Sequence, residues 1–338
     1  MYSQTRAGMI RADVARDPAL LYVPDSTGST VTVISQRTRR IVRVLHAGQL
    51  SQHVVPAYDL KRMYVTSSIS NEVVAISPRK GRLLGSRRVP RPYNLYFTPD
   101  GRAAIVMVEQ HDVIRFSDPR TFAPIADVRS PGCWGPNHAD FSANGRFFVV
   151  TCEFSGELLK ISTLGHRVIG RLKLAPRRHP MPGMGTSMPQ DVRLSPDGTT
   201  FYVADMGTDQ LRLISARTFR QSAVLDMPSH PHGIYPSRDG NHLYISDRGA
   251  GEVTVLSTRT NKIVDTWRIP GGGSPDMGGV SADGRMLWLS GRYDGVVYGF
   301  STRTGRLVAK IRVGGSPHGL VVWPQPGRYS LGHTGNIR

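Results

Sequence analysis

The sequence has few cysteines and no long apolar run. Two cysteines in 338 residues are too few for a disulfide-stapled scaffold, although they are enough for one bridge. No stretch approaches the roughly 18 to 20 consecutive apolar residues of a transmembrane helix. Residues 1–18 mix arginine with aspartate and lack the apolar core of a signal peptide. We therefore expect no transmembrane segment, in a protein that is either cytoplasmic or exported with a signal removed before this numbering begins.

Several catalytic motifs are also absent. Neither cysteine belongs to a Cys-x-x-Cys-His haem attachment sequence, and the chain has no Walker loop, no Gly-x-Ser-x-Gly elbow and no His-Glu-x-x-His motif. These absences argue against covalent haem, nucleotide hydrolysis and serine-hydrolase chemistry.

Acidic residues are scarce relative to basic ones. The chain has 25 Asp and Glu against 43 Lys and Arg, which gives a formal charge of +18. The basic residues fall singly in recurring turn positions, and the densest runs are short: Arg37 to Arg40, Arg87 to Arg91 and Arg177 to His179. Without a polybasic stripe, nucleic acid is not an expected partner. The charge indicates either a solvated basic surface or attraction to anionic cell-surface polymers or phospholipid.

An apolar-rich element ending in serine recurs seven times. Its serines are Ser35, Ser77, Ser117, Ser162, Ser215, Ser257 and Ser301, and their spacings are 42, 40, 45, 53, 42 and 44 residues. Periods of 40 to 50 residues are typical of propeller blades. A second β-rich run precedes each copy and a third follows it, so the repeats predict strands b, c and d of a blade.

An innermost strand precedes a turn of the Asp-Gly type in most repeats. The seventh copy, Pro317 to Val322, comes last and has no outer strands after it, whereas the first outer strands have no clear inner strand before them. Pairing these two ends removes exposed sheet edges. We therefore predict an all-β fold, a seven-bladed propeller of four-stranded antiparallel blades, closed by the C-terminal inner strand against the N-terminal strands.

The predicted propeller is one domain covering residues 1–338, with a lead-in at 1–18 and a C-terminal tail at 324–338. The single spacing of 53 residues locates an inserted loop at 175–188, rich in Pro, Gly and Met. A long loop on a regular scaffold is often functional. This loop either caps the channel or is a neutral surface excursion.

Three stretches resemble the YVTN-repeat propeller family, and the resemblance extends over nearly the whole chain: Tyr64-Val65-Thr66, Tyr202-Val203-Ala204-Asp205 and the turn Ser195 to Gly198. Three others are similar to bacterial members that usually carry an export or lipoprotein signal: Met188 to Asp191, Gly271 to Asp276 and Pro324 to Arg338. The resemblance implies an extracellular or periplasmic location, with a cytoplasmic one as the alternative. The wider clan includes lactonases, lyases, haem-binding and copper-binding reductase domains and amine dehydrogenase subunits, so the fold does not select a function.

Candidate site residues gather on one predicted face, where the inner strands start and the b–c turns lie. The inner-strand starts carry His53, His138, Gln190, His232, Asp276 and His318, and the b-strand ends carry Glu109, Glu153, Asp205 and Asp247. Four imidazoles in equivalent places are suited to Cu or Zn, and carboxylates would orient their second nitrogens.

The four histidines do not share one register. His232 and His318 stand in Pro-His-Gly, whereas His53 and His138 are one residue further along. Because neighbouring residues on a strand point to opposite faces, we expect only two of them to share a ring. Pro-His-Gly also recurs in YVTN repeats as a turn element whose imidazole bonds a neighbouring blade. The histidines are therefore structural, part of a metal or cofactor site, or metal-free acid/base catalysts.

These patterns favour a monomeric propeller that binds a small ligand, metal or protein partner over the channel face. The alternative is an enzyme that uses the same face, either a metal-dependent oxidoreductase or a lyase with a histidine base.

The two cysteines are expected to form a disulfide. Cys133 lies just before the inner strand of the fourth blade, and Cys152 ends the adjacent b strand. Both should therefore lie near each other on one face.

Overall fold

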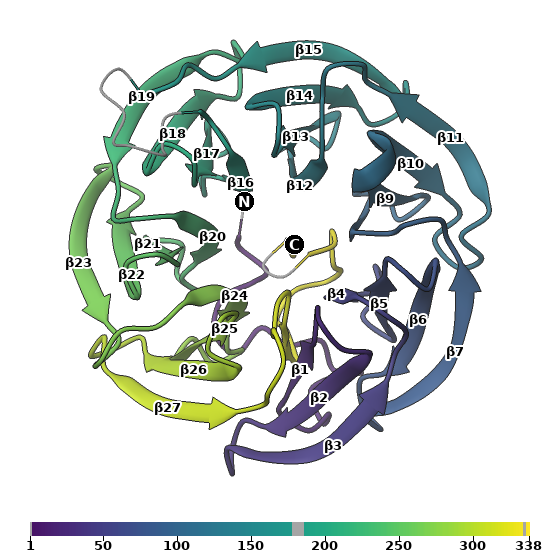
Figure 1. The fold of residues 1–338 in the computed structure, drawn as a ribbon, viewed down its shortest axis with the longest axis vertical. Coiled ribbons are helices and arrows are strands. Elements are labelled where there is room, and N and C mark those ends of the chain that lie inside the picture. Colours follow the sequence, from purple (N-terminus) through teal and green to yellow (C-terminus); the bar gives the residue numbers. More distant parts are fainter. Residues whose placement is uncertain (1, 178–185, 334–335) are drawn as a thin grey trace.

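The computed structural model describes residues 2–177, 186–333 and 336–338, which form a ring of blades around a central axis (Figure 1). Seven sheets, each of four antiparallel strands, make up the ring. The predicted seven-bladed propeller is confirmed.

The strands are given by blade, each from the axis outward. Blade 1 holds β28 (Val321–Trp323), β1 (Leu20–Pro24), β2 (Thr30–Ser35) and β3 (Arg40–His46). Blade 2 holds β4 (Ser51–Pro56), β5 (Met63–Ser67), β6 (Glu72–Ser77) and β7 (Arg82–Arg88). Blade 3 holds β8 (Asn94–Phe97), β9 (Ala104–Val108), β10 (Val113–Ser117) and β11 (Pro124–Arg129), with a 3-10 turn, η1 (Glu109–His111), between β9 and β10.

Blade 4 holds β12 (Pro136–Phe141), β13 (Phe147–Cys152), β14 (Glu157–Ser162) and β15 (Arg167–Lys173). Blade 5 holds β16 (Pro189–Leu194), β17 (Thr200–Asp205), β18 (Gln210–Ser215) and β19 (Gln221–Asp226). Blade 6 holds β20 (Pro231–Pro236), β21 (His242–Asp247), β22 (Glu252–Ser257) and β23 (Lys262–Arg268). Blade 7 holds β24 (Pro275–Val280), β25 (Met286–Gly291), β26 (Val296–Ser301) and β27 (Leu307–Arg312).

The ring closes as the sequence predicts. Strand β28 pairs antiparallel with β1, so that Leu20 faces Trp323 and Tyr22 faces Val321. Strand β28 thereby becomes the inner strand of a blade whose other strands come from the N-terminal part of the chain, and it pairs the edge of β1 that would otherwise be exposed.

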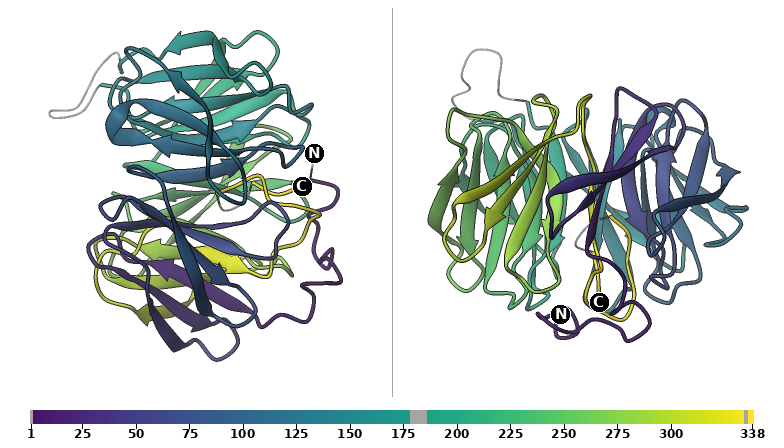
Figure 2. Two further views of the ribbon diagram at one scale, coloured as in Figure 1. Left: turned by 90° about the vertical axis from the view of Figure 1, so that its right-hand side faces the viewer. Right: turned by 90° about the horizontal axis from the view of Figure 1, so that it is seen from below.

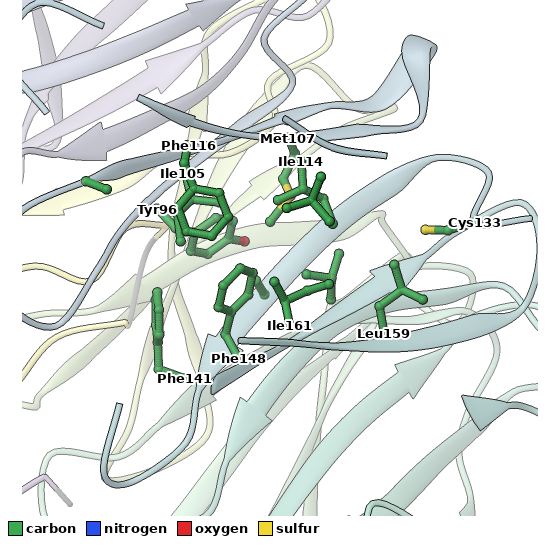
Figure 3. Close-up of a cluster of buried hydrophobic side chains, with 14 of the residues drawn as sticks. Tyr96, Ile105, Met107, Ile114, Phe116, Cys133, Phe141, Phe148, Leu159 and Ile161 are labelled. Atoms are coloured by element: carbon green, nitrogen blue, oxygen red, sulfur yellow. The ribbon is translucent and has the colours of Figure 1, made fainter. Parts of the chain in front are cut away.

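The hydrophobic core lies between neighbouring blades. Between blades 3 and 4, Tyr96, Phe116, Phe141 and Phe148 pack with aliphatic side chains from both sheets, and Cys133 lies at the edge of the same cluster (Figure 3). The outermost strands are largely solvent-exposed; in β7, for example, every residue is exposed. Much of the positive charge is therefore carried on the rim of the ring, away from the axis.

The inner strands share an irregularity near their first residues. In blade 4, Pro136 pairs with Cys152 and Ala139 pairs with Val150, so two residues of β12 oppose one residue of β13. The same bulge occurs in blades 2, 5, 6 and 7. The bulge takes an inner-strand amide out of the hydrogen-bond ladder, and a hydroxyl group on strand b accepts a hydrogen bond from that amide. Thr66 Oγ1 accepts from His53 N, and Thr151 Oγ1 accepts from His138 N. A bulge of this kind changes the direction in which side chains point.

The Asp-Gly turns adopt the left-handed backbone conformation that their sequence suggests. Gly198 has φ of 76° and Gly240 has φ of 74°, a region where a side chain is disfavoured. The backbone conformation of these turns therefore accounts for the glycines. The turns lie at the end of the ring opposite the starts of the inner strands.

The two ends of the chain lie at the same end of the ring (Figure 2). There Tyr2 Oη donates to Leu194 O at 2.8 Å, Asn336 Nδ2 donates to Ala139 O at 2.8 Å, and Phe97 N donates to Leu331 O at 2.9 Å. The lead-in and the tail therefore contact the last residues of the inner strands and cover this end of the channel.

Most of the loop expected at 175–188 lies outside the described residues, because 178–185 are not described. Its described ends are anchored, since Ala175 O accepts from Arg212 and Ser187 Oγ donates to Asp205, both at 2.7 Å. In the described part of the chain, no helix has the length and apolar character needed to cross a membrane.

Cys133 and Cys152 are joined by a disulfide, the pairing expected from the sequence, with their Cα atoms 5.1 Å apart. We expect unreduced, denatured protein to show no titratable thiol. Because the bridge closes a loop with a sequence separation of 19, the free energy of unfolding of the double variant Cys133→Ser/Cys152→Ser should be about 3 kcal/mol lower than that of the wild type. Two free thiols in the unreduced protein would contradict the pairing.

Candidate functional site

Five imidazoles meet at the axis of the ring. The ring centroid of His53 lies 4.8 Å from those of His318 and His333 and 5.7 Å from that of His138. His138 is 5.2 Å from His333, and His232 is 6.2 Å from both His138 and His318. All five side chains are buried. We call these residues the axial histidines.

The contacts of His53 fix its orientation. Its Nδ1 donates a hydrogen bond to Tyr93 O at 2.9 Å, so the proton of the neutral ring resides on Nδ1 and Nε2 carries the lone pair. Nε2 is buried and has no hydrogen-bond partner among the described residues. Metal-ligating histidines commonly have this arrangement, because the backbone carbonyl fixes the tautomer and turns the free nitrogen inward.

His138 presents a second unpartnered nitrogen. Its Nδ1 lies 3.2 Å from Asn94 Nδ2 and 3.4 Å from Tyr96 Oη, whereas its buried Nε2 has no partner among the described residues. Burial, reinforced by the nearby His318, lowers the pKa of His138 to about 3. The ring is therefore neutral at physiological pH.

Asp276 lies against the other two predicted histidines and orients one of them, His318. Its Oδ2 lies 2.8 Å from His318 Nδ1 and accepts a hydrogen bond from it. Its Oδ1 is 3.1 Å from His232 Nδ1, a close approach without hydrogen-bond geometry. Burial alone would raise the pKa of Asp276, but the surrounding His232, Arg248 and His318 outweigh it and hold the pKa well below its usual value. Asp276 is therefore a buried carboxylate anion.

The expectation that only two histidines share a ring does not match the structure. The one-residue offset of His53 and His138 relative to His232 and His318 is real, but the alternation rule holds only for a regular strand. The bulge at the start of β4, β12 and β20, visible in their shifted register, lets both positions reach the axis.

His333, which comes from the C-terminal tail, was not among the residues predicted from the sequence. The tail passes the inner strands of blades 2 and 3, where Tyr96 forms an isolated bridge with Gly332 and Ser330 N donates to Tyr58 O. This route places His333 next to both His53 and His138. The only signal was a histidine within the tail stretch that resembles exported YVTN proteins.

Two predicted carboxylates and Gln190 lie above the axial histidines, near the mouth of the channel. Glu153 accepts a hydrogen bond from Asn137, and burial raises its pKa. Burial and the nearby Glu153 together raise the pKa of Glu109 to about 8. Gln190 is buried, and its Nε2 donates to Met188 O at 3.4 Å.

Asp205 and Asp247 have structural contacts instead. Asp205 forms a buried ion pair with Arg212 at 2.6 Å and accepts from Met188 N. Asp247 Oδ2 accepts from both the amide and the hydroxyl of Thr254. These contacts tie neighbouring strands and loops together, away from the axial cluster.

Two arginines that the sequence analysis did not select complete the mouth. Arg248 Nη1 donates to Asp276 Oδ1 at 3.2 Å. Because His318 Nδ1 donates to Asp276, Arg292 Nη1 donates to His318 Nε2, at 3.1 Å. Both arginines directly follow b strands. At these b-strand ends, only acidic residues were predicted from the sequence to belong to the site.

One group of donors at the axis has the spacing of a metal site. A ligand atom from each of His138, Asp191 and His333 lies within 4.8 Å of the others, and all three residues are buried. Asp191 has other bonds, since its Oδ2 accepts from Arg193 Nη2 at 3.2 Å and from Ile234 N at 2.9 Å. His138, whose Nε2 has no partner among the described residues, is therefore a freer donor than Asp191.

Comparison with known protein families gives two matches. The model of the family described as lactonase, 7-bladed beta-propeller, matches residues 25–222, which is more than half of the chain. The model described as YNCE-like beta-propeller matches residues 172–327. A search of curated proteins found no significant match.

Solved structures of similar fold share little sequence with the chain. A functionally unknown protein from Desulfotomaculum acetoxidans has a TM-score of 0.71 at 15% identity, covering 90% of this chain and 98% of its own. Kuenenia stuttgartiensis hydrazine synthase has a TM-score of 0.66 at 17% identity, covering 82% and 90%. The dihydro-heme d1 dehydrogenase NirN, in complex with DHE, has a TM-score of 0.65 at 13% identity, covering 93% and 78%. These likenesses establish the fold alone.

Proposed function

Because the chain belongs to the lactonase family of seven-bladed β-propellers, a fold that hosts many chemistries, we propose its function from the site itself: it binds a first-row transition metal ion, copper or zinc, through the axial histidines. His53 and His138 are the principal ligands, because their buried Nε2 atoms have no partner among the described residues, and His333, whose ligand atom lies within 4.8 Å of that of His138, is the third. Asp276 and Tyr93 O orient the imidazoles without binding the ion.

The observation that supports this proposal best is the pair of unpartnered nitrogens. The Nε2 atoms of His53 and His138 are buried and have no hydrogen-bond partner in the described part of the chain. Leaving such an atom without a partner costs about 1 to 3 kcal/mol. A bound metal ion would satisfy both atoms at once, whereas histidines that merely connect blades would use them in hydrogen bonds.

The protonation state of the cluster also suits a metal. Burial lowers the pKa of all five axial histidines, to about 3 for His138 and about 4 for His318. A metal competes with protons for imidazole, and these rings are already neutral. Neutral imidazole is a good ligand for copper and zinc.

Metal analysis of protein purified without a histidine tag tests the proposal. We expect about one equivalent of copper or zinc per chain, either as purified or after incubation with the metal and desalting. His53→Ala combined with His138→Ala should abolish this stoichiometric binding, because both principal ligands are lost. His46→Ala, at an exposed position on β3, is the matched control and should bind normally.

The proposal fails if the wild-type protein takes up no stoichiometric metal. It also fails if the double variant loses several kcal/mol of stability yet binds metal as the wild type does. In that case the imidazoles act as contacts between blades.

A second candidate function is catalysis at the same centre. The pKa of Glu109, raised to about 8 by burial and Glu153, would let this carboxyl group exchange protons near neutral pH, as a general acid or base must. Its place near the mouth would put it beside a molecule that approaches the metal.

A further inference from the structure

A cavity opens between blades 7 and 1, at the end of the ring opposite the starts of the inner strands. Its volume is about 440 Å³, which falls within the range of small-molecule sites. Blade 7 contributes Trp288 and the turn Ser281 to Asp283, and blade 1 contributes Gln36 and Arg37, while residues of the lead-in line another side. None of the axial histidines belongs to this lining. The cavity is therefore separate from the proposed metal site.

Aromatic residues at one position of the repeat make a contact with the next blade. Tyr22 and Tyr202 are the third residues of β1 and β17, as Trp288 is of β25. Tyr22 Oη donates to Pro78 O at 2.6 Å. Tyr202 Oη donates to Asn261 Oδ1 at 2.5 Å. Each acceptor lies in the turn between the two outermost strands of the following blade, so this hydroxyl group ties neighbouring blades together.

Trp288 does not make the corresponding contact. Its partner would lie in the turn between β2 and β3 of blade 1, where Gln36 and Arg37 line the cavity. Trp288 Nε1 is instead buried and has no hydrogen-bond partner among the described residues. An indole N–H lies closer to the backbone than a tyrosine hydroxyl does, so it stops short of the turn. A buried donor without a partner requires an explanation, and a ligand that accepts a hydrogen bond supplies one.

The rest of the lining is largely apolar. It includes the following side chains: Ile10, Ala15, Ala19, Ala282, Met286 and Pro324. Met286 also packs against the hydrophobic cluster that contains Trp288. Because a methionine side chain is flexible, its displacement by a ligand opens the covered indole edge to the cavity.

The charged groups of the lining do not favour an ionic ligand. They are two carboxylates and one guanidinium group: Asp17, Asp283 and Arg37. Arg79 Nε lies 3.6 Å from Asp17, and both Arg285 and Arg238 lie near Asp283. Arg37 is exposed, so water solvates its guanidinium group. An anion would meet two carboxylates, and a cation would compete with the arginines that already face them.

We propose that this cavity binds a small, uncharged, largely apolar molecule that carries one acceptor oxygen. The oxygen accepts a hydrogen bond from Trp288 Nε1, and the apolar body packs on the alanine and methionine side chains. The site goes beyond the proposed metal binding and does not depend on it.

Titration of tryptophan-¹⁵N-labelled protein with acetophenone tests the site, because the four tryptophans of the chain give four indole N–H resonances. We expect acetophenone to bind at one site per chain and to move the Trp288 indole proton downfield. α-Methylstyrene, which has a similar shape without the oxygen, should bind about tenfold more weakly, because the hydrogen bond is lost, and should cause no downfield shift. Trp288→Phe assigns the resonance and should lower acetophenone affinity to that of α-methylstyrene.

Two further variants separate binding at the cavity from effects on folding. Ala15 is exposed, so Ala15→Phe should fold, and its ring should fill the cavity and abolish acetophenone binding with Trp288 intact. Trp134→Phe is the matched control, because Trp134 is 60% exposed and outside the lining; it should leave acetophenone affinity unchanged. The site is overturned if acetophenone causes no downfield shift of the Trp288 resonance, or if its affinity survives in Trp288→Phe or in Ala15→Phe. Benzoate that binds more tightly than acetophenone would contradict an uncharged ligand.

Discussion

Gly319→Ala should reduce the metal affinity of the protein about 100-fold. A Cβ atom at residue 319 would lie 2.1 Å from Cδ2 of the His53 ring and 2.7 Å from its Cγ. The imidazole is buried and cannot keep its place, so it must give up the hydrogen bond to Tyr93 O and turn Nε2 away from the axis. Loss of such an orienting contact typically costs 10- to 100-fold in metal affinity, and here the ligand itself is displaced.

The measurement is a competition titration with a chelator of known affinity, together with a denaturant melt. Overpacking should lower the free energy of unfolding by on the order of 1 to 3 kcal/mol, so the variant should still fold. Gly279→Ala on strand β24 is the matched control, because its Cβ would meet only Val322 Cγ2 at 3.4 Å. Metal affinity within twofold of the wild type in Gly319→Ala would show that His53 is not a ligand.

The metal-free protein should lose stability in acid through its axial histidines, and His138 gives the clearest case. Burial and the nearby His318 lower its pKa to about 3 in the folded state, against 6.5 for an ordinary histidine. Between these values the unfolded chain binds the proton and the folded chain does not, so the free energy of unfolding falls as the pH falls. The contribution is about 1.4 kcal/mol per pH unit.

The test compares wild type with His138→Gln, both without metal, by urea unfolding at pH 7 and pH 5. Relative to the variant, the wild type should lose about 2 kcal/mol over this interval, since about 1.5 pH units of it lie below 6.5. Buried carboxyl groups with raised pKa, such as Glu109, contribute with the opposite sign, but they are common to both proteins and cancel in the difference. Parallel pH profiles for the two proteins would mean that His138 titrates normally and is accessible to water.

The fold could be predicted from the sequence because each blade repeats a local pattern. The serine-terminated element marks strand c in every repeat, and the turns around it leave little choice of hairpin. The closure could be predicted because two unmatched pieces remain once the other blades are assigned. Pro317 to Val322 is an inner strand with no outer strands after it, and the first blade has outer strands but no inner strand before them. Each of these inferences depended only on strand order, which hydrophobic pattern and turn residues determine.

The site was harder to predict, because it depends on where side chains point. Four axial histidines could be predicted from their places at the inner-strand starts: His53, His138, His232 and His318. The rule that neighbouring strand residues face opposite sides then led to the wrong expectation that only two of them share a ring. The rule failed because it did not include the bulge. The bulge is marked in the sequence by a hydroxyl residue on strand b, such as Thr66 or Thr151, which accepts a hydrogen bond from the inner-strand amide. The position of His333 depends on the path of the tail, and the positions of the guanidinium groups at the mouth depend on the length of the arginine side chains. A periodic sequence pattern predicts neither.

The participation of the tail in the axial cluster has a consequence for biosynthesis. His53 and His138 emerge early from the ribosome, but His318 and His333 can join them only after residue 333 has been made. Until then the nascent chain has an open ring, and any metal it captures would be held by an incomplete set of ligands that solvent can reach. If the protein binds a metal ion as proposed, selection of that ion would be a post-translational event that coincides with the docking of the last inner strand and the tail. The compartment in which the ring closes, more than the one in which translation occurs, would decide which ion the protein carries.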